Sequence, residues 1–370
     1  MNILMVSSNS HSLLNFRREL LERFLERNFS VVVSAPVDEH TKYLVEIFEK
    51  LKIKFVPFEI QNNRKNIFFD LLSIFNLIKI IKSNKIDCIF CYHMKPVIYG
   101  SIVARALGLK HIYAMITGLG YVFTENEGFS ISMTRSLLEK LLLFSLLLNK
   151  KVFFQNKDDF DFICKSERLK NSSVIVNGSG VDVDFFKLTD IPKTLSFLFV
   201  GRLLVHKGIY EYVGAARILK KKYPHVSFKI AGGFHSNPTA ISEGDLKNWI
   251  QEGIIDYLGD VHDMLPIFQA SSVCVLPSYR EGCPRSLLEA MAVGRAIITT
   301  DTPGCRETVI ENENGYLVPI KNIKKLSEAM EKCIHSPSLM KEMGLKSRHL
   351  AEEKFNVHKV NKVILEGMGL

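Results

Sequence analysis

The 370-residue sequence has few of the features that mark secreted or membrane-spanning proteins. Its seven cysteines are odd in number and spread along the chain, so they do not form the disulfide framework of a secreted domain. No segment reaches the run of about 18–20 uncharged apolar residues that a spanning helix needs. The start, MNILMVSSNS, lacks the parts of a signal peptide and predicts a first strand. We expect a protein of the reducing cytoplasm.

Signatures of nucleic-acid and metal binding are also missing. The net charge of +9 indicates anionic partners, and the basic residues are spread over the whole chain. No helix-turn-helix, zinc-finger or single-strand platform pattern accompanies them, so phosphorylated substrates or an anionic membrane surface are favoured over nucleic acid. The one close cysteine pair, Cys88 and Cys91, lies in an apolar run without a second pair and predicts buried core. We expect neither a metal nor another cofactor.

Short β-branched runs alternate with amphipathic stretches in both halves of the chain. This alternation is typical of α/β domains, in which helices cover both faces of a parallel sheet. We expect strands at residues 3–6, 31–33, 55–58, 86–90, 111–116, 196–200, 227–231, 273–276 and 296–300. We expect helices at residues 14–27, 41–51, 67–82, 97–107, 209–222, 263–270 and 284–292.

The chain is longer than a single core usually grows, so the two series of strands predict two Rossmann-like domains. The first would comprise residues 1–176 and the second residues 194–350. Residues 177–193, rich in Gly, Asp, Asn and Pro, would link them, and residues 351–370 would form a helix that crosses back to the first domain. Because such sheets bind ligands at the carboxyl ends of their strands, we expect a site in a central cleft between the domains.

Two segments of the first half combine apolar residues with flanking lysines and arginines. They are residues 64–85 and residues 137–148. Both are too short in uncharged apolar residues to span a bilayer. Each can instead form a helix that packs on the sheet, or one whose apolar face enters a membrane surface while its basic residues approach anionic head groups.

The segment PSYREGCPRSLLEAMAVGRAIITT at residues 277–300 carries the most chemical information. It predicts a strand end, a loop, a helix and the next strand. Pro284 suits the first helical position, and the N–H groups that follow it can cradle a diphosphate. Glu281 lies in the loop, and Glu289 lies within the helix, where a carboxylate can accept hydrogen bonds from ribose hydroxyls.

A second segment, FVGRLLVHKG at residues 199–208, places two cations after an apolar strand. Arg202 and Lys207 offer what a nucleoside-diphosphate leaving group needs, because they stabilise negative charge that grows as a sugar–phosphate bond breaks. Taken one at a time, Arg and Lys are ordinary solvated residues of loops. The pair indicates a donor site because it precedes the glutamate segment in the sequence.

These two segments, together with NGSGVDVDFF at residues 177–186, resemble the GT4 family of retaining glycosyltransferases, which have the GT-B fold. The resemblance covers almost all of the C-terminal half and is looser in the N-terminal half, where the family binds its varied acceptors. It implies that Arg202 and Lys207 hold the donor diphosphate, that Glu281 touches the donor sugar, and that Glu289 binds the ribose. It further implies donor contacts from Gly201, Gly232, Gly282, Cys283, Arg285, Ser286, Thr117 and Gly118. Family members need no metal.

Within the family, the chain most resembles bacterial enzymes that extend undecaprenyl-diphosphate-linked sugars in O-antigen, capsule or glycan assembly. The opening SSNSHSLLNFRREL at residues 7–20, ITGLGYVF at residues 116–123 and PSYREGCPRSLLEA carry this closer resemblance. It implies a UDP-linked hexose or N-acetylhexosamine donor, a lipid-linked acceptor, and a peripheral location on the inner face of the cytoplasmic membrane.

Candidate acceptor residues follow strands of the first half. His93 and Lys95, in CYHMKP, follow a strand end and can bind an acceptor phosphate, and His93 can also assist proton transfer. Arg17, in the first helix, is a further candidate for the acceptor phosphate. Two departures from the family affect this half: Ser-Asn-Ser at residues 8–10 replaces a Gly-Gly turn, and Thr117 stands where many members have histidine.

Other functions stay open at this point. A glycosyltransferase or synthase acting on a soluble acceptor, a UDP-sugar epimerase of the same fold, and a membrane-surface scaffold with an inactive donor site share parts of the pattern. The scaffold is disfavoured because both cations and both glutamates are present. An NAD-dependent dehydrogenase would need G-x-G-x-x-G after the first strand, where this chain has SSNSHS.

Overall fold

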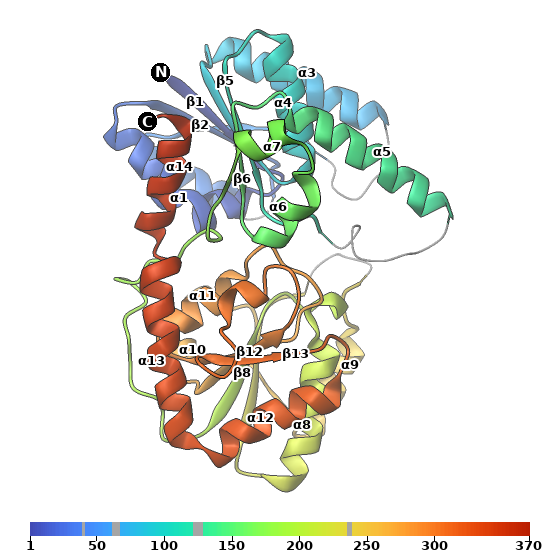
Figure 1. Ribbon diagram of the computed structural model, residues 1–370, viewed down its shortest axis with the longest axis vertical. Coiled ribbons are helices and arrows are strands. Elements are labelled where there is room, and N and C mark those ends of the chain that lie inside the picture. The colour runs from blue at the N-terminus through green and yellow to red at the C-terminus, as the bar shows by residue number, and fades with distance from the viewer. Residues whose placement is uncertain (39–40, 61–66, 121–128, 235–238) are drawn as a thin grey trace. The chain divides into compact units, whose positions relative to one another are not determined.

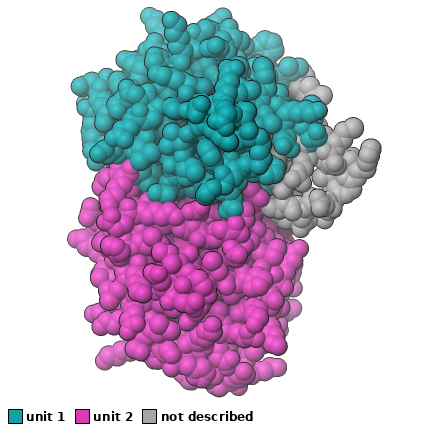
Figure 2. Space-filling view, viewed as in Figure 1, with its two compact units in different colours: residues 1–179, 360–370 teal, residues 180–359 magenta. Residues whose placement is uncertain are grey.

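The computed structural model describes residues 1–38, 41–60, 67–120, 129–234 and 239–370. The chain forms two compact units, shown in two colours in Figure 2. The first unit contains residues 1–179 and 360–370, and the second contains residues 180–359. Each unit is built around one parallel sheet, as the alternation of strands and helices predicts (Figure 1).

The sheet of the first unit has seven strands in the order β3-β2-β1-β4-β5-β6-β7. The strands are β1 (Asn2–Val6), β2 (Ser30–Ala35), β3 (Lys54–Pro57), β4 (Cys88–Tyr92), β5 (His111–Ile116), β6 (Lys151–Phe154) and β7 (Ser173–Ile175). The helices are α1 (Ser10–Glu26), α2 (Thr41–Lys50), α3 (Ile67–Ser83), α4 (Met94–Ala106), α5 (Phe129–Leu146), α6 (Lys157–Ile163) and α7 (Glu167–Ser172).

Alternating side chains of β1 divide the first unit into two hydrophobic clusters, because successive residues of a strand face opposite sides of the sheet. Ile3 and Met5 belong to a cluster with residues of α1 and α2. Leu4 and Val6 belong to a second cluster with residues of α3, α4 and α5. Helix α1 begins at Ser10, four residues before the expected start, because the Asn9 side chain accepts a hydrogen bond from the Ser12 N–H and caps it.

The sheet of the second unit has six strands in the order β10-β9-β8-β11-β12-β13. The strands are β8 (Ser196–Val200), β9 (Ser227–Ala231), β10 (Asp256–Tyr257), β11 (Val273–Leu276), β12 (Ala296–Thr300) and β13 (Gly315–Val318). The α-helices are α8 (Ile209–Lys222), α9 (Glu243–Gln251), α10 (Leu265–Gln269), α11 (Arg285–Ala292), α12 (Ile323–His335), α13 (Pro337–Lys354) and α14 (Val357–Met368). Short 3-10 helices span Val205–Lys207 and Arg306–Thr308.

The last helix, α14, begins in the second unit and continues into the first, to which residues 360–370 belong. Val360, Ile364 and Met368 are buried in the same cluster as Ile3. The Tyr113 hydroxyl donates to the Met368 carbonyl at 2.7 Å, which ties the end of α14 to β5.

The segment of residues 177–193 has no regular helix or strand, but it is packed rather than free. The boundary between the units falls within it, at residues 179 and 180. Val181 and Phe186 are buried in the core of the second unit. The Arg348 guanidinium donates to the Phe186 carbonyl at 2.7 Å, and that of Arg295 donates to the Thr189 carbonyl at 2.8 Å. A composition rich in Gly, Asp, Asn and Pro predicts irregular backbone, and it does not exclude burial.

Candidate active site

In the second unit, the candidate site lies at the ends of the neighbouring strands β8 and β11. After β8 the chain continues to β9 on one side of this pair, and after β11 it continues to β12 on the other side. Such switch points are the ordinary ligand sites of parallel sheets. The loop after β8 runs through residues 201–208, and the loop after β11 runs through residues 277–284. The two loops touch, because the Tyr279 N–H donates to the His206 carbonyl at 2.9 Å. Gly208 has a φ of +75°, and a Cβ there would lie 2.1 Å from the Pro277 carbonyl oxygen.

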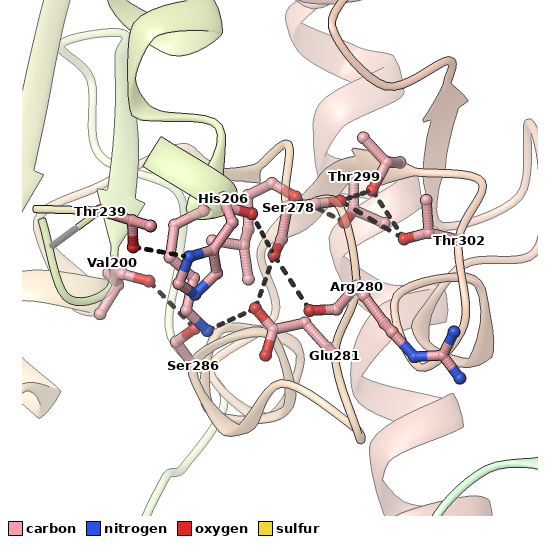
Figure 3. A network of polar contacts seen from close by, with 12 residues as sticks. Val200, His206, Thr239, Ser278, Arg280, Glu281, Ser286, Thr299 and Thr302 are labelled. Atoms are coloured by element: carbon pink, nitrogen blue, oxygen red, sulfur yellow. Dashed lines mark hydrogen bonds and ion pairs between the residues drawn. The ribbon is translucent and has the colours of Figure 1, made fainter. Parts of the chain in front are cut away.

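Lys207 and Glu281 form an ion pair across these two loops. Their side chains are 15% and 13% exposed, so solvent screens the pair less than it screens a surface pair. The Ser278 hydroxyl donates to the same carboxylate oxygen, Glu281 Oε1, at 2.7 Å (Figure 3). The structure therefore brings together a cation and a carboxylate that are separated by 74 positions in the sequence.

Glu289 lies inside α11, one turn after Arg285, which donates through Nε to Glu289 Oε1 at 2.7 Å. Burial raises the pKa of the Glu289 carboxyl, and the charge and hydrogen bond of Arg285 oppose that rise. At the same helix start, the Ser286 hydroxyl donates to the Val200 carbonyl at 3.2 Å and ties α11 to the end of β8. Arg285, Ser286 and Glu289 thus lie beside the Lys207–Glu281 loops in one unit.

The glycines and the second cation of the site differ in their roles. Gly232 has a φ of +150°, and a Cβ there would lie 1.9 Å from the Gly201 carbonyl oxygen, so the ends of β8 and β9 approach closely only with glycine. Arg202 follows Gly201 and is exposed at the end of β8. Cys283 follows Gly282, and burial raises the pKa of its thiol above the ordinary value, so it is not a ready thiolate nucleophile.

His206 is a neighbour of the site that the sequence does not single out. Burial and the charge of Lys207 lower the pKa of its imidazole, while the charge of Glu281 opposes this. Its Nδ1 lies 3.3 Å from the Thr239 hydroxyl. The lowered pKa favours a neutral imidazole at pH values near 7, so His206 does not add a positive charge to Lys207.

In the first unit, the corresponding switch point lies between β1 and β4. Its loops place the imidazole Nδ1 of His93 at 3.1 Å from the Ser8 hydroxyl and 3.2 Å from the Ser7 hydroxyl. His93 has a φ of +68° and a ψ of 152°, a conformation that is strained for a side-chain-bearing residue. Ser8, the first residue of the Ser-Asn-Ser turn, and Ser7 before it thus fix the orientation of the imidazole.

The remaining acceptor candidates have partners within the first unit. Lys95 pairs with Asp70 of α3 at 3.1 Å. Arg17 is only 1% exposed, and its guanidinium lies 5.2 Å from the centre of the Tyr92 ring. A phosphate contact through Arg17 requires movement of the side chain from this buried position, so its role as an acceptor residue stays a prediction.

Thr117 and Gly118 follow β5 directly and are partly exposed, and Gly118 has a φ of +125°. The rest of the motif at residues 121–123 lies outside the described residues. Within the described ranges, no group of three or more His, Cys, Asp or Glu side chains is arranged to hold a metal ion. The expectation of metal-free catalysis stays a prediction.

Sequence reasoning missed the residues that hold the site in place. Ser278 and Thr300 are buried hydroxyl residues, and the Thr300 hydroxyl donates to the Ser278 carbonyl. Serine and threonine at strand ends are common in any sequence, and the spatial contact between the ends of β11 and β12 reveals the role. The segment at residues 277–300 does contain one signal for Ser278, which is its position three residues before Glu281.

Comparison with known proteins covers both units. Residues 3–155 match the family model described as Glycosyl transferase 4-like, and residues 181–350 match the one described as Glycosyl transferases group 1. A protein of Campylobacter jejuni, N,N'-diacetylbacillosaminyl-diphospho-undecaprenol α-1,3-N-acetylgalactosaminyltransferase, is 28% identical over 353 residues, which are 92% of this chain and 91% of that protein.

Two further proteins are similar over most of their length. UDP-Gal:α-D-GlcNAc-diphosphoundecaprenol α-1,3-galactosyltransferase of Escherichia coli is 24% identical over 320 residues, which are 80% of this chain and 78% of that protein. The crystal structure of HepE from Anabaena in complex with UDP superposes with a TM-score of 0.77 at 15% identity and covers 100% of both chains.

Proposed function

The chain belongs to the two-domain glycosyltransferases of the GT-B fold, and from this premise we propose that it moves a hexose or N-acetylhexosamine from a UDP-sugar to a saccharide linked to polyprenyl diphosphate. The relative from Campylobacter jejuni carries most of the proposal, because its similarity extends over both units and its name specifies a diphospho-undecaprenol acceptor. The Escherichia coli relative names the same lipid and a UDP-linked donor. The Anabaena structure contains UDP.

The donor half of the reaction would take place at the switch point of the second sheet. Breaking the bond between sugar and phosphate leaves negative charge on the departing UDP. Lys207 and Arg202 would bind that charge, as would the N–H groups at the start of α11. Glu281 would accept hydrogen bonds from hydroxyls of the sugar, and Glu289 would accept those of the ribose.

Glu281 holds Lys207 in place through their ion pair. A diphosphate that approaches Lys207 brings a second anion to an ammonium group with three donor hydrogens, so Lys207 can bind the phosphate without leaving Glu281. The pair therefore joins recognition of the sugar, through the carboxylate, to stabilisation of the leaving group, through the cation.

Retention of the anomeric configuration is part of the proposal. UDP-hexoses are commonly α-glycosides, and the names of both relatives specify α-1,3 products. In a front-face reaction the departing phosphate oxygen accepts the proton of the acceptor hydroxyl, so no separate base on the opposite face is needed. Lys95 and the oriented imidazole of His93 would bind the acceptor diphosphate in the first unit, and Arg17 would join them if it leaves its buried position.

The surface of α3 and α5 supports a peripheral place at the inner face of the cytoplasmic membrane. Both helices pack against α4 (Figure 1). Large apolar side chains on them are exposed, Phe75 to 66% and Leu137 to 68%. Exposed lysines on or next to the two helices are Lys79, Lys82, Lys85, Lys140 and Lys150. An apolar surface bordered by lysines fits the head-group region of an anionic bilayer.

Among the described residues, no helix combines the length and the apolar character that crossing a bilayer requires. Arg64 and Lys65, which flank α3 in the sequence, lie outside the described residues.

The test is transfer with a defined acceptor. The purified chain is incubated with UDP-sugars, a GDP-sugar, a chelator and a short polyprenyl-diphosphate N-acetylhexosamine, and the product is read by mass spectrometry and its anomeric proton by NMR. We expect one added sugar in α linkage from a UDP donor. Transfer to the free saccharide with none to the lipid-linked one would favour a synthase with a soluble acceptor. Conversion of the UDP-sugar without transfer would favour an epimerase.

A further inference from the structure

Ser278 is two positions beyond the end of β11 and is fully buried. Its hydroxyl has one proton to donate and three acceptor oxygens within reach. These are Glu281 Oε1 at 2.7 Å, the His206 carbonyl oxygen at 3.1 Å and the Arg280 carbonyl oxygen at 3.4 Å (Figure 3). The carboxylate is both the nearest acceptor and the charged one, so it receives the proton. The Ser278 hydroxyl therefore donates its only proton to the Glu281 carboxylate.

The two oxygens of Glu281 are not equivalent. Oε1 accepts from the Ser278 hydroxyl and from Lys207 Nζ. Oε2 receives no hydrogen bond from any described residue. Two donors from different directions fix the plane of the carboxylate, and Oε2 is left to accept from a substrate hydroxyl.

The backbone around Ser278 is held independently of its hydroxyl. Its carbonyl accepts from the hydroxyls of Thr300 and Thr302, the latter at 3.4 Å. The Glu281 N–H donates to the Pro303 carbonyl at 3.0 Å. Removing the hydroxyl of Ser278 thus takes one constraint from the Glu281 side chain and leaves the loop that carries it in place.

We propose that Ser278 is a positioning residue, which orients the Glu281 carboxylate and thereby sets how strictly the site selects the donor sugar. This inference rests on the proposed function, because it needs a sugar hydroxyl opposite Oε2. Without Ser278, Lys207 alone holds the carboxylate, which can then rotate as the ammonium group follows the diphosphate. Binding of UDP uses Lys207 and not Ser278, so it should not change.

The test compares Ser278→Ala with the matched variant Ser272→Ala. Ser272 is also fully buried, and its hydroxyl accepts from the Ser196 N–H at 3.2 Å, at the opposite end of β11. Dissociation constants for UDP and for the UDP-sugar are measured by calorimetry, and kcat/KM is measured for two UDP-sugars that differ only at C4. Thermal unfolding of each variant separates loss of function from loss of fold.

For Ser278→Ala we expect an unchanged affinity for UDP, a kcat/KM for the preferred donor lower by about tenfold, and a smaller ratio between the two C4 epimers. Ser278→Cys, whose thiol is a weaker donor, should lie between, and it replaces the alanine variant if that variant does not fold. Because Ser278 acts through Glu281, its replacement should change sugar affinity little in a Glu281→Ala background, which has no carboxylate for Ser278 to orient.

Two outcomes overturn the inference while the proposed function stands. Retention of wild-type rates and epimer ratio by Ser278→Ala would show that Lys207 suffices to orient Glu281. Loss of UDP affinity in parallel with the rates would show that Ser278 only maintains the loop. If the wild-type chain itself turns over no nucleotide sugar, the proposed function fails, and the inference fails with it. The wild-type measurement therefore tells the two failures apart.

Discussion

The switch point of the second sheet carries an ion pair, whereas that of the first sheet carries serine hydroxyls around one imidazole. Lys207 and Glu281 meet after β8 and β11, and Ser7, Ser8 and His93 meet after β1 and β4. The same topology thus presents an ammonium group and a carboxylate in one unit, and hydroxyls around an imidazole in the other. The contrast fits a division in which the second unit stabilises a leaving diphosphate and the first orients an incoming group.

The largest expected effect comes from breaking the ion pair. Lys207→Ala and Glu281→Ala should each lower kcat for sugar transfer by about 100-fold to 1000-fold, because each removes a charge that acts on the reacting bond or the sugar. The measurement is initial transfer rate with thermal unfolding of each variant. Lys247→Ala, a change of an exposed lysine on α9, is the control and should keep the wild-type rate. Full activity in either site variant would refute the donor site.

A smaller effect is expected at the switch point of the first sheet. His93→Gly should lower transfer to the lipid-linked acceptor by about tenfold or more while leaving UDP affinity unchanged, because the imidazole serves the acceptor half. Glycine also relieves the positive φ of His93, so the variant should fold. The comparison is with His111→Ala, an exposed histidine at the start of β5.

If His93→Gly weakens UDP binding as much as it lowers transfer, the division of labour between the two switch points is wrong. An unchanged rate of transfer would remove His93 from the acceptor site.

The surface of α3 and α5 gives a third test of the contrast between the units. Replacing Leu71, Phe75 and Phe144 by asparagine should reduce binding to anionic vesicles several-fold, since each exposed apolar side chain adds to burial in the head-group region. The same change at the exposed Ile250 of the second unit should have no effect on binding. Sedimentation with vesicles measures both, and equal binding by the triple variant and the wild type would exclude this surface as the membrane contact.

The smallest effect concerns Glu289 and pH. Burial raises its pKa in the folded protein, so the stability that this group contributes is present below the unfolded pKa and is lost as pH rises through the raised value. Glu289→Gln should therefore be more stable than the wild type at about pH 8, with a smaller difference at about pH 4. Thermal unfolding at the two pH values measures this. A difference that is larger at low pH would contradict the direction of the shift.

The sequence predicts the four central strands of the second sheet, but not its edge strands β10 and β13. The β-branched runs at residues 196–200, 227–231, 273–276 and 296–300 are strands with those bounds, because buried parallel strands are continuous apolar runs. In the first unit, α4 begins at Met94 rather than at residue 97, since its start has no hydrogen-bonding cap that a pattern could reveal.

The individual contacts of the sites could not be predicted in the same way. The residue types of Lys207 and Glu281 indicate donor chemistry, but their pairing depends on two loops that lie far apart in the sequence. Arg17 shows the opposite case, because an arginine in an amphipathic helix predicts exposure, and tertiary packing over Tyr92 buries it. The contact between Thr300 and Ser278 forms only because β11 and β12 are neighbours in the sheet, which the sequence alone does not show.

The most direct test of the central claim is donor binding by the purified chain in the presence of a chelator. A panel of UDP- and GDP-sugars is screened by thermal unfolding and by slow hydrolysis of the donor, for the wild type and for Lys207→Ala. We predict that a UDP-sugar raises the unfolding temperature of the wild type and is slowly hydrolysed, and that Lys207→Ala loses both responses. A well-folded wild-type sample that responds to no nucleotide sugar would contradict the account.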